Sequence, residues 1–234
     1  RARERDPGDV EAWATLARIA ESQGQLTEAA ADWQRAAENA PENREILLNA
    51  GRLALRLKKP QEAQAYFGEI LALGADSETS VKIAFAYLAS RQLQLAAKVL
   101  DQARATNSEP RLHFYAGLVY ERAREFEKAA KAFEAVPASL GEVALDARVH
   151  RASCLSLLGR TPEALAVLEA VQKEKPTLPG LDAALSRVQE RAGRVRDAEV
   201  TLVRSLGRQA SIDVLDALGA FYTRQNRLDD AVSL

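Results

Sequence analysis

A spacing of about 34 residues between aligned alanines constrains the fold of this chain more than any other feature. The spacings are 34, 33, 33, 35, 34 and 33 residues, and they separate Ala29, Ala63, Ala96, Ala129, Ala164, Ala198 and Ala231. A large apolar side chain follows each of the first six alanines by four residues, at Trp33, Phe67, Leu100, Phe133, Leu168 and Leu202. A fixed period with aligned small and large apolar sites predicts an array of stacked helical hairpins.

Each period also contains an upstream helix. In the first period, Trp13, Leu16, Ala17 and Ala20 follow helical spacing, and Gly24 separates them from a second helix. The upstream helices share one small site, occupied by Ala17, Gly51, Ala84, Gly117, Ala152, Ser186 and Gly219. A small residue allows two helices to approach closely, so we interpret this site as a packing position. The composition agrees, because Ala is abundant while Gly and Pro number only 12 and 8.

The first period matches a known signature. Trp13, Leu16, Ala17, Gly24, Ala29, Trp33, Ala36 and Pro41 lie at the spacing of the tetratricopeptide repeat, and the chain resembles that family over nearly its whole length. The resemblance implies an all-α fold, an α-solenoid in which antiparallel helix hairpins stack into a right-handed superhelix. We expect residues 1–234 to form a single array with units at 10–43, 44–76, 77–109, 110–144, 145–178, 179–211 and 212–234. Residues 1–9 resemble the tail of a preceding repeat and the last unit is incomplete, so we expect a piece of a longer protein.

The fifth and sixth units depart from the pattern. Arg148 and Asp182 stand at the site of Trp13, and Arg151 stands at the site of Leu16. An arginine in a dry stack is costly unless it is paired or reaches water. Upstream of them, Pro137 is expected to end the second helix of the fourth unit about a turn early. Two interpretations stay open: a longer loop with a slightly rotated helix, or a change of superhelical curvature with an exposed contact surface.

The charge balance and the few reactive residues argue against several classes of function. With 32 basic and 33 acidic residues the net charge is -1, which disfavours a general nucleic-acid binder. No apolar run approaches the ~20 residues that a membrane-spanning helix needs. Cys154 follows His150 by four residues, and we interpret it as a packing thiol rather than part of a nucleophile pair. We therefore expect no enzyme activity, no cofactor and no metal site.

The resemblance implies that the first helices line a concave face, where partners of this family usually bind. On that basis we expect a groove for a protein or peptide partner at Leu48, Asn49, Arg52, Leu55, Arg56, Lys82, Phe85, Leu88, Phe114, Tyr115, Leu118 and Arg122. Apolar anchors of the partner would enter the groove, and its acidic residues would meet the four cations. One subtype captures a C-terminal carboxylate, but the matching sites hold Ala14, Arg18, Asn49, Glu78 and Lys82, a set that disfavours such capture.

Other functions stay open from the sequence. The array is an alternative candidate for a structural spacer or a self-assembly module, and a third hypothesis is regulation of an enzyme domain elsewhere in the chain. The excess of Arg over Lys suggests a bacterial source, and bacterial arrays of this kind often belong to cell-envelope assemblies. The sequence leaves a cytoplasmic and a periplasmic location equally open.

Overall fold

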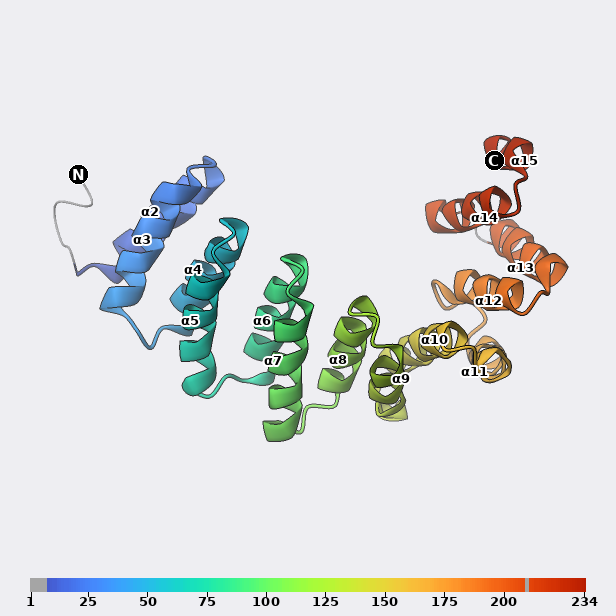
Figure 1. Cartoon of the computed structure of the whole chain (residues 1–234), viewed down its shortest axis with the longest axis horizontal. Coiled ribbons are helices and arrows are strands. Elements are labelled where there is room, and N and C mark those ends of the chain that lie inside the picture. The colour runs from blue at the N-terminus through green and yellow to red at the C-terminus, as the bar shows by residue number, and fades with distance from the viewer. Residues whose placement is uncertain (1–7, 209–210) are drawn as a thin grey trace. The chain divides into compact units, whose positions relative to one another are not determined.

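The computed structural model describes residues 8–208 and 211–234, and every regular element in that part of the chain is helical. The all-α prediction is thereby confirmed. In chain order the helices are α2 (Val10–Ser22), α3 (Leu26–Asn39), α4 (Arg44–Arg56), α5 (Pro60–Ala72), α6 (Ser77–Ala89), α7 (Leu93–Thr106), α8 (Arg111–Arg122), α9 (Phe126–Glu134), the 3-10 turn η1 (Ala138–Leu140), α10 (Glu142–Leu157), α11 (Thr161–Glu174), α12 (Leu181–Arg191), α13 (Val195–Arg208), α14 (Ile212–Arg224) and α15 (Leu228–Val232) (Figure 1).

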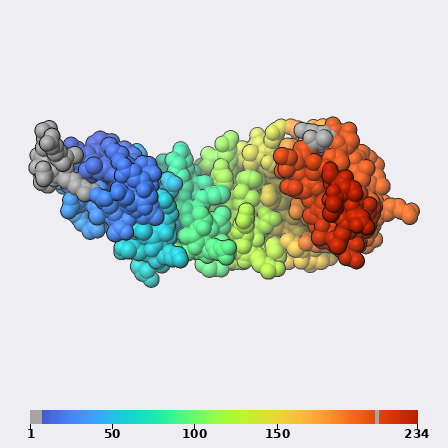
Figure 2. Space-filling model, turned by 90° about the horizontal axis from the view of Figure 1, so that it is seen from above, coloured from blue at the N-terminus to red at the C-terminus, as the bar shows by residue number. Residues whose placement is uncertain are grey.

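The chain divides into two compact units after Leu112. In unit 1, α2 pairs with α3, α4 with α5 and α6 with α7, while α3 contacts α4 and α4 contacts α6. The large side chains of the repeat pattern lie inside, and Trp33, Phe67 and Leu100 are all buried. Side chains fill the spaces between the consecutive hairpins of each unit (Figure 2). The predicted hairpin packing is therefore present within unit 1.

The small site of the first helices is a packing position, as predicted. A Cβ atom added to Gly51 would lie 2.3 Å from Cε1 of Phe67. In unit 2, a Cβ atom on Gly117 would lie 2.5 Å from Cε1 of Phe133. Because no real Cβ contact is that short, only glycine allows each first helix to lie against the aromatic ring of its hairpin partner.

Local capping determines where the first helices of unit 1 begin. The Asp9 side chain accepts a hydrogen bond from the amide of Ala12, and the Asn43 side chain accepts from Ile46. The carboxylate of Asp76 accepts from the amide of Thr79 at 2.7 Å, and this bond lowers the pKa of Asp76. Each of these side chains satisfies an amide that has no partner within its own helix.

In unit 2, α10 pairs with both α9 and α11, α12 pairs with α13, and α14 pairs with α15. The helix before Pro137 is short, as predicted, since α9 ends at Glu134. The turn η1 follows, and Gly141, the residue just before α10, has a φ of 59°. The connection between α9 and α10 is therefore longer than the α3–α4 and α5–α6 connections, because proline cannot continue the helix.

The charged residues at core sites of unit 2 are all paired. Arg148 donates to Glu174 at 2.6 Å, and Arg151 donates to Glu134 at 2.6 Å. Asp182 accepts from Arg208 at 2.5 Å. These pairs meet the condition under which arginines are tolerated beside a packed core.

Candidate functional site

The predicted groove residues of unit 1 lie on α4 and α6, which contact each other. Leu48, Asn49 and Leu88 are half-buried, whereas Arg52, Arg56 and Lys82 are exposed. Phe85 on α6 is 37% exposed, an unusual position for an aromatic side chain. Leu55 is only 8% exposed, so core packing accounts for this side chain and it adds little to the surface.

Most cations of this surface already have acidic partners within the fold. Arg56 Nη1 donates to Glu21 at 2.5 Å, which joins α4 to α2. Lys82 forms an ion pair of 2.6 Å with Glu78, one helical turn away. Arg52 makes no ion pair among the described residues. Of the three cations predicted in unit 1, Arg52 is thus the one that remains available to a partner.

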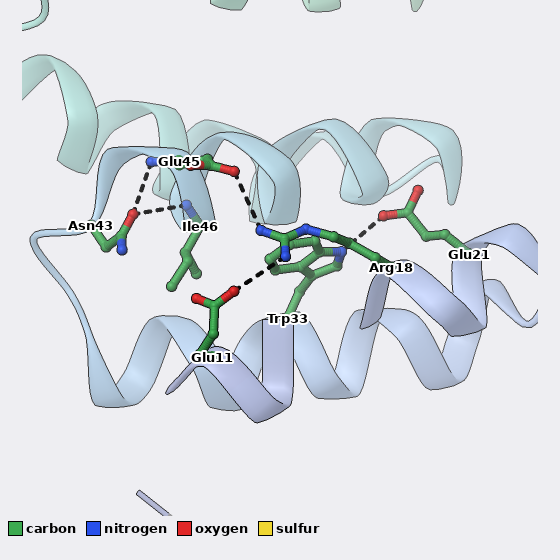
Figure 3. A network of polar contacts seen from close by, with 7 residues as sticks. All are labelled: Glu11, Arg18, Glu21, Trp33, Asn43, Glu45 and Ile46. Atoms are coloured by element: carbon green, nitrogen blue, oxygen red, sulfur yellow. Dashed lines mark hydrogen bonds and ion pairs between the residues drawn. The ribbon is translucent and has the colours of Figure 1, made fainter. Parts of the chain in front are cut away.

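A polar network that the sequence analysis did not predict joins α2 to α4 (Figure 3). The guanidinium of Arg18 donates to Glu11 at 3.4 Å and to Glu45 at 3.3 Å, and it lies 5.7 Å from the centre of the Trp33 ring. The Trp33 indole donates to Glu21 at 2.8 Å. Arg18 is therefore occupied within the fold, and Glu78 at a neighbouring site adds negative charge, so carboxylate capture at these positions remains disfavoured.

The predicted groove residues of unit 2 lie on α8. Phe114, Tyr115 and Leu118 are half-buried, and Arg122 is exposed with no ion pair among the described residues. The ring of Phe114 packs edge-on against Phe133, with centroids 5.9 Å apart, so part of its role is in the core. The same cluster includes His150, whose ring stacks on Phe133 at 5.2 Å.

The structure gives His150 a carboxylate neighbour that sequence spacing did not reveal. Its Nδ1 atom lies 2.8 Å from Oε2 of Glu121, a residue 29 positions earlier on α8. A search by spacing along one helix misses this pair because the two residues belong to consecutive hairpins. The described residues contain no group of three His, Cys, Asp or Glu side chains arranged to hold a metal ion.

The thiol of Cys154 is fully buried, as expected for a packing residue. Burial raises its pKa to about 12, and the nearby Glu121 acts in the same direction. A thiol with this pKa stays protonated at neutral pH, and the thiolate is the nucleophilic form. The environment of Cys154 is therefore that of an inert core thiol.

Comparison with known families decides the identity of the fold. A family model described as the tetratricopeptide repeat matches residues 1–43, 14–78 and 81–144. The chain belongs to the tetratricopeptide repeat family. Tetratricopeptide repeat proteins are generally non-catalytic scaffolds for protein–protein interaction, and this fold supports the same general role here. No described helix is long and apolar enough to cross a membrane.

Solved structures with the same fold differ widely in sequence. A tetratricopeptide repeat protein from Parabacteroides merdae has a TM-score of 0.66 and 18% identity, and the match covers 95% of this chain and 89% of that protein. PilW, described as a widely conserved type IV pilus biogenesis factor, has a TM-score of 0.56 and 16% identity, with 89% and 98% covered. The Cut9–Hcn1 hetero-tetramer of APC/C has a TM-score of 0.53 and 13% identity, with 94% and 44% covered. The curated proteins include no match to this chain.

Proposed function

We propose that this tetratricopeptide repeat chain binds a protein partner through the first helices of unit 1. The surface consists of five side chains on α4 and α6, and we name it the α4–α6 surface: Leu48, Asn49, Arg52, Phe85 and Leu88. The helices that carry it are held by the buried core beneath them. A partner would meet a surface fixed before binding, which lowers the entropy cost of association.

The exposure of Phe85 is the observation that carries this proposal. Its side chain is 37% exposed, although aromatic residues contribute most to stability when they are buried. Leu88 follows Phe85 by three residues on α6 and is half-buried. A partner that covered both side chains would remove apolar area from water, and aromatic anchors of this kind dominate many interfaces.

Arg52 gives the α4–α6 surface a positive charge that favours a partner with a carboxylate. It is exposed and makes no ion pair among the described residues, whereas Arg56 and Lys82 are held by Glu21 and Glu78. We therefore expect the partner to place one carboxylate near Arg52, beside the apolar residues that cover Phe85. The sequence analysis expected acidic residues of the partner to meet four cations, whereas the structure leaves Arg52 as the cation of this surface for a partner carboxylate.

We further propose that the partner belongs to a bacterial cell-envelope assembly. Its support is the expected bacterial source together with the fold shared with PilW, a type IV pilus biogenesis factor. A partner from the envelope would support it, and a partner from another compartment would oppose it.

The test is quantitative affinity capture from a lysate of the source organism, with Phe85→Glu compared to the unchanged chain. Phe85→Glu is preferable to a substitution of Phe114, because Phe114 packs on Phe133 and its loss would damage the core of unit 2. Val203 on α13 provides a matched control, since it is 48% exposed and lies outside the α4–α6 surface. Circular dichroism must first show equal helicity for all three proteins.

We expect a partner that is recovered with the unchanged chain and with Val203→Glu but is depleted with Phe85→Glu. A direct titration of that partner should then show at least about tenfold weaker binding, the size of effect expected for a buried aromatic anchor. Equal recovery with Phe85→Glu would contradict the proposal. Recovery of the chain itself alone would instead support the spacer or self-assembly alternative.

A further inference from the structure

A second surface, in unit 2, gathers three arginines from two first helices. Arg187 and Arg191 lie one turn apart on α12, and Arg224 ends α14. We name these three residues the arginine cluster. Arg224 contacts Glu190, the residue next to Arg191. Desolvation by the surrounding protein lowers the pKa of Arg187, and the positive charges of Arg224 and Arg191 act in the same direction. Like charges repel at this range, so an anion bound among the three arginines would be stabilised by all of them.

Only part of the cluster's positive charge is neutralised within the fold. The Nε atom of Arg224 donates to Glu190 at 3.1 Å and its Nη2 atom donates at 2.9 Å. The amide of Gln225 also donates to Glu190, at 2.7 Å. Glu190 is therefore occupied by Arg224 and Gln225. The other nearby carboxylate, Glu121, acts on the pKa of Arg187 in the opposite direction, and its Oε2 atom lies 2.8 Å from Nδ1 of His150.

The repeat register shows why Arg191 lacks a carboxylate. Arg56 pairs with Glu21, 35 residues earlier, and Arg224 pairs with Glu190, 34 residues earlier. The same position, 35 residues before Arg191, holds Ser156, and the contact is a weak hydrogen bond of 3.4 Å. A neutral hydroxyl thus stands at the position where Glu21 pairs with Arg56 and Glu190 pairs with Arg224.

Arg187 likewise makes no ion pair among the described residues. In the first repeat the equivalent arginine, Arg18, bridges to Glu45 at the start of the next first helix. The matching position on the next first helix, α14, is Asp213, yet the described residues contain no ion pair between Arg187 and Asp213. Both arginines of α12 are exposed, so an external anion has access to them.

An exposed leucine adds an apolar element to this surface. Leu157 on α10 occupies the register position of Arg191 one repeat earlier, and α10 contacts α12. The side chain is 42% exposed, which is high for a leucine in a packed array. The surface therefore combines positive charge with apolar area, the composition of a peptide site rather than of a site for a free ion.

We propose that the arginine cluster and Leu157 bind an acidic segment of a protein partner, with carboxylate side chains on Arg187 and Arg191 and an apolar side chain on Leu157. Planar guanidinium groups suit carboxylates because they donate two parallel hydrogen bonds. Nucleic acid fits poorly because three arginines provide too few phosphate contacts.

The test uses the full chain and a fluorescein-labelled peptide made of four repeats of Glu-Glu-Leu, with binding followed by fluorescence anisotropy at low salt. The variant is Arg187→Gln/Arg191→Gln, and Arg224 is left intact because it holds Glu190. The matched control is Arg196→Gln/Arg204→Gln, which removes the same charge from exposed arginines of α13. Circular dichroism confirms equal helicity before titration.

We expect the cluster variant to bind the peptide about tenfold more weakly or worse, while the control variant changes affinity by less than about threefold. Raising the salt concentration should weaken binding to the unchanged chain and narrow the difference between the two variants. A peptide of Gln-Gln-Leu repeats should bind to none of the proteins.

Three outcomes would overturn the proposal. The first is an equal loss of peptide affinity in both arginine variants, which would show that binding depends only on the net charge of the chain. The second is displacement of the peptide by millimolar inorganic phosphate, which would make the cluster a phosphate site. The third is tighter binding of single-stranded DNA than of the acidic peptide. None of these readouts involves Phe85, so they are independent of the α4–α6 surface.

Discussion

The Nδ1 atom of His150 lies 2.8 Å from the Oε2 atom of Glu121 and joins the first helices α8 and α10. The imidazole also stacks on Phe133, whose ring fills the space beside Gly117. The His150 side chain thus contacts both the Glu121 carboxylate at the surface of the first helices and the Phe133 ring in the core. This arrangement makes the histidine a structural link between two consecutive hairpins.

We expect His150→Ala to lower the free energy of unfolding by about 2 kcal/mol, because it removes the stack on Phe133 and leaves Glu121 without its partner. Glu121→Gln should cost less than about 1 kcal/mol, since an amide retains an acceptor for the ring. Urea unfolding of both variants and of the double variant gives their coupling energy. Strictly additive effects would contradict a direct interaction between the two residues.

A second prediction concerns the glycines of the first helices. Gly51→Ala should lower the free energy of unfolding by about 2 kcal/mol or more, because the new methyl group would overlap the ring of Phe67. Gly68 on α5 is the matched control, since a Cβ atom there meets nothing within 4 Å. Gly68→Ala should stabilise the protein by up to about 1 kcal/mol through helix propensity. Thermal unfolding compares the two variants, and equal effects would refute the packing argument.

The repeat pattern predicted the core of this fold because it records which side chains must be buried. Ala29, Trp33 and Phe67 all lie inside, and Pro137 shortens the helix before it through local backbone chemistry. The burial of these side chains and the early end of α9 both follow from the residue type at one position of a helix. They are therefore visible in the sequence.

The polar contacts between helices were harder to predict. Arg56 and Glu21 are 35 residues apart, and nothing on either helix alone identifies them as partners. Long side chains choose among several neighbours, so the choice depends on the three-dimensional packing of consecutive hairpins. A comparison of residues one repeat apart provides the missing signal, since Arg224 and Glu190 repeat the same relationship at a spacing of 34.

The N-terminal cap of α6 predicts a defined dependence on pH. Hydrogen bonds from Thr79 lower the pKa of Asp76, so the carboxylate stabilises the native state at pH values above its ordinary pKa. That contribution is lost as the pH falls through the lower native pKa. Asp76→Ala should therefore cost about 1 kcal/mol at pH 7, and the difference from the unchanged chain should shrink below about pH 4. Urea unfolding at a series of pH values tests this, and a difference that grows in acid would contradict it.

The buried thiol of Cys154 predicts how the chain reacts with thiol reagents. Burial raises its pKa to about 12, so in native protein the group is both protonated and shielded from solvent. We expect Ellman's reagent at pH 8 to label the native protein slowly and the urea-unfolded protein at once, because only unfolding exposes an ordinary thiol. The unfolded thiol ionises from about pH 9 upward while the native thiol does not, so stability should fall as the pH rises above that value. Cys154→Ala provides the control, since it removes this alkaline loss of stability. Rapid stoichiometric labelling of folded protein would show that α10 opens far more readily than its packing implies.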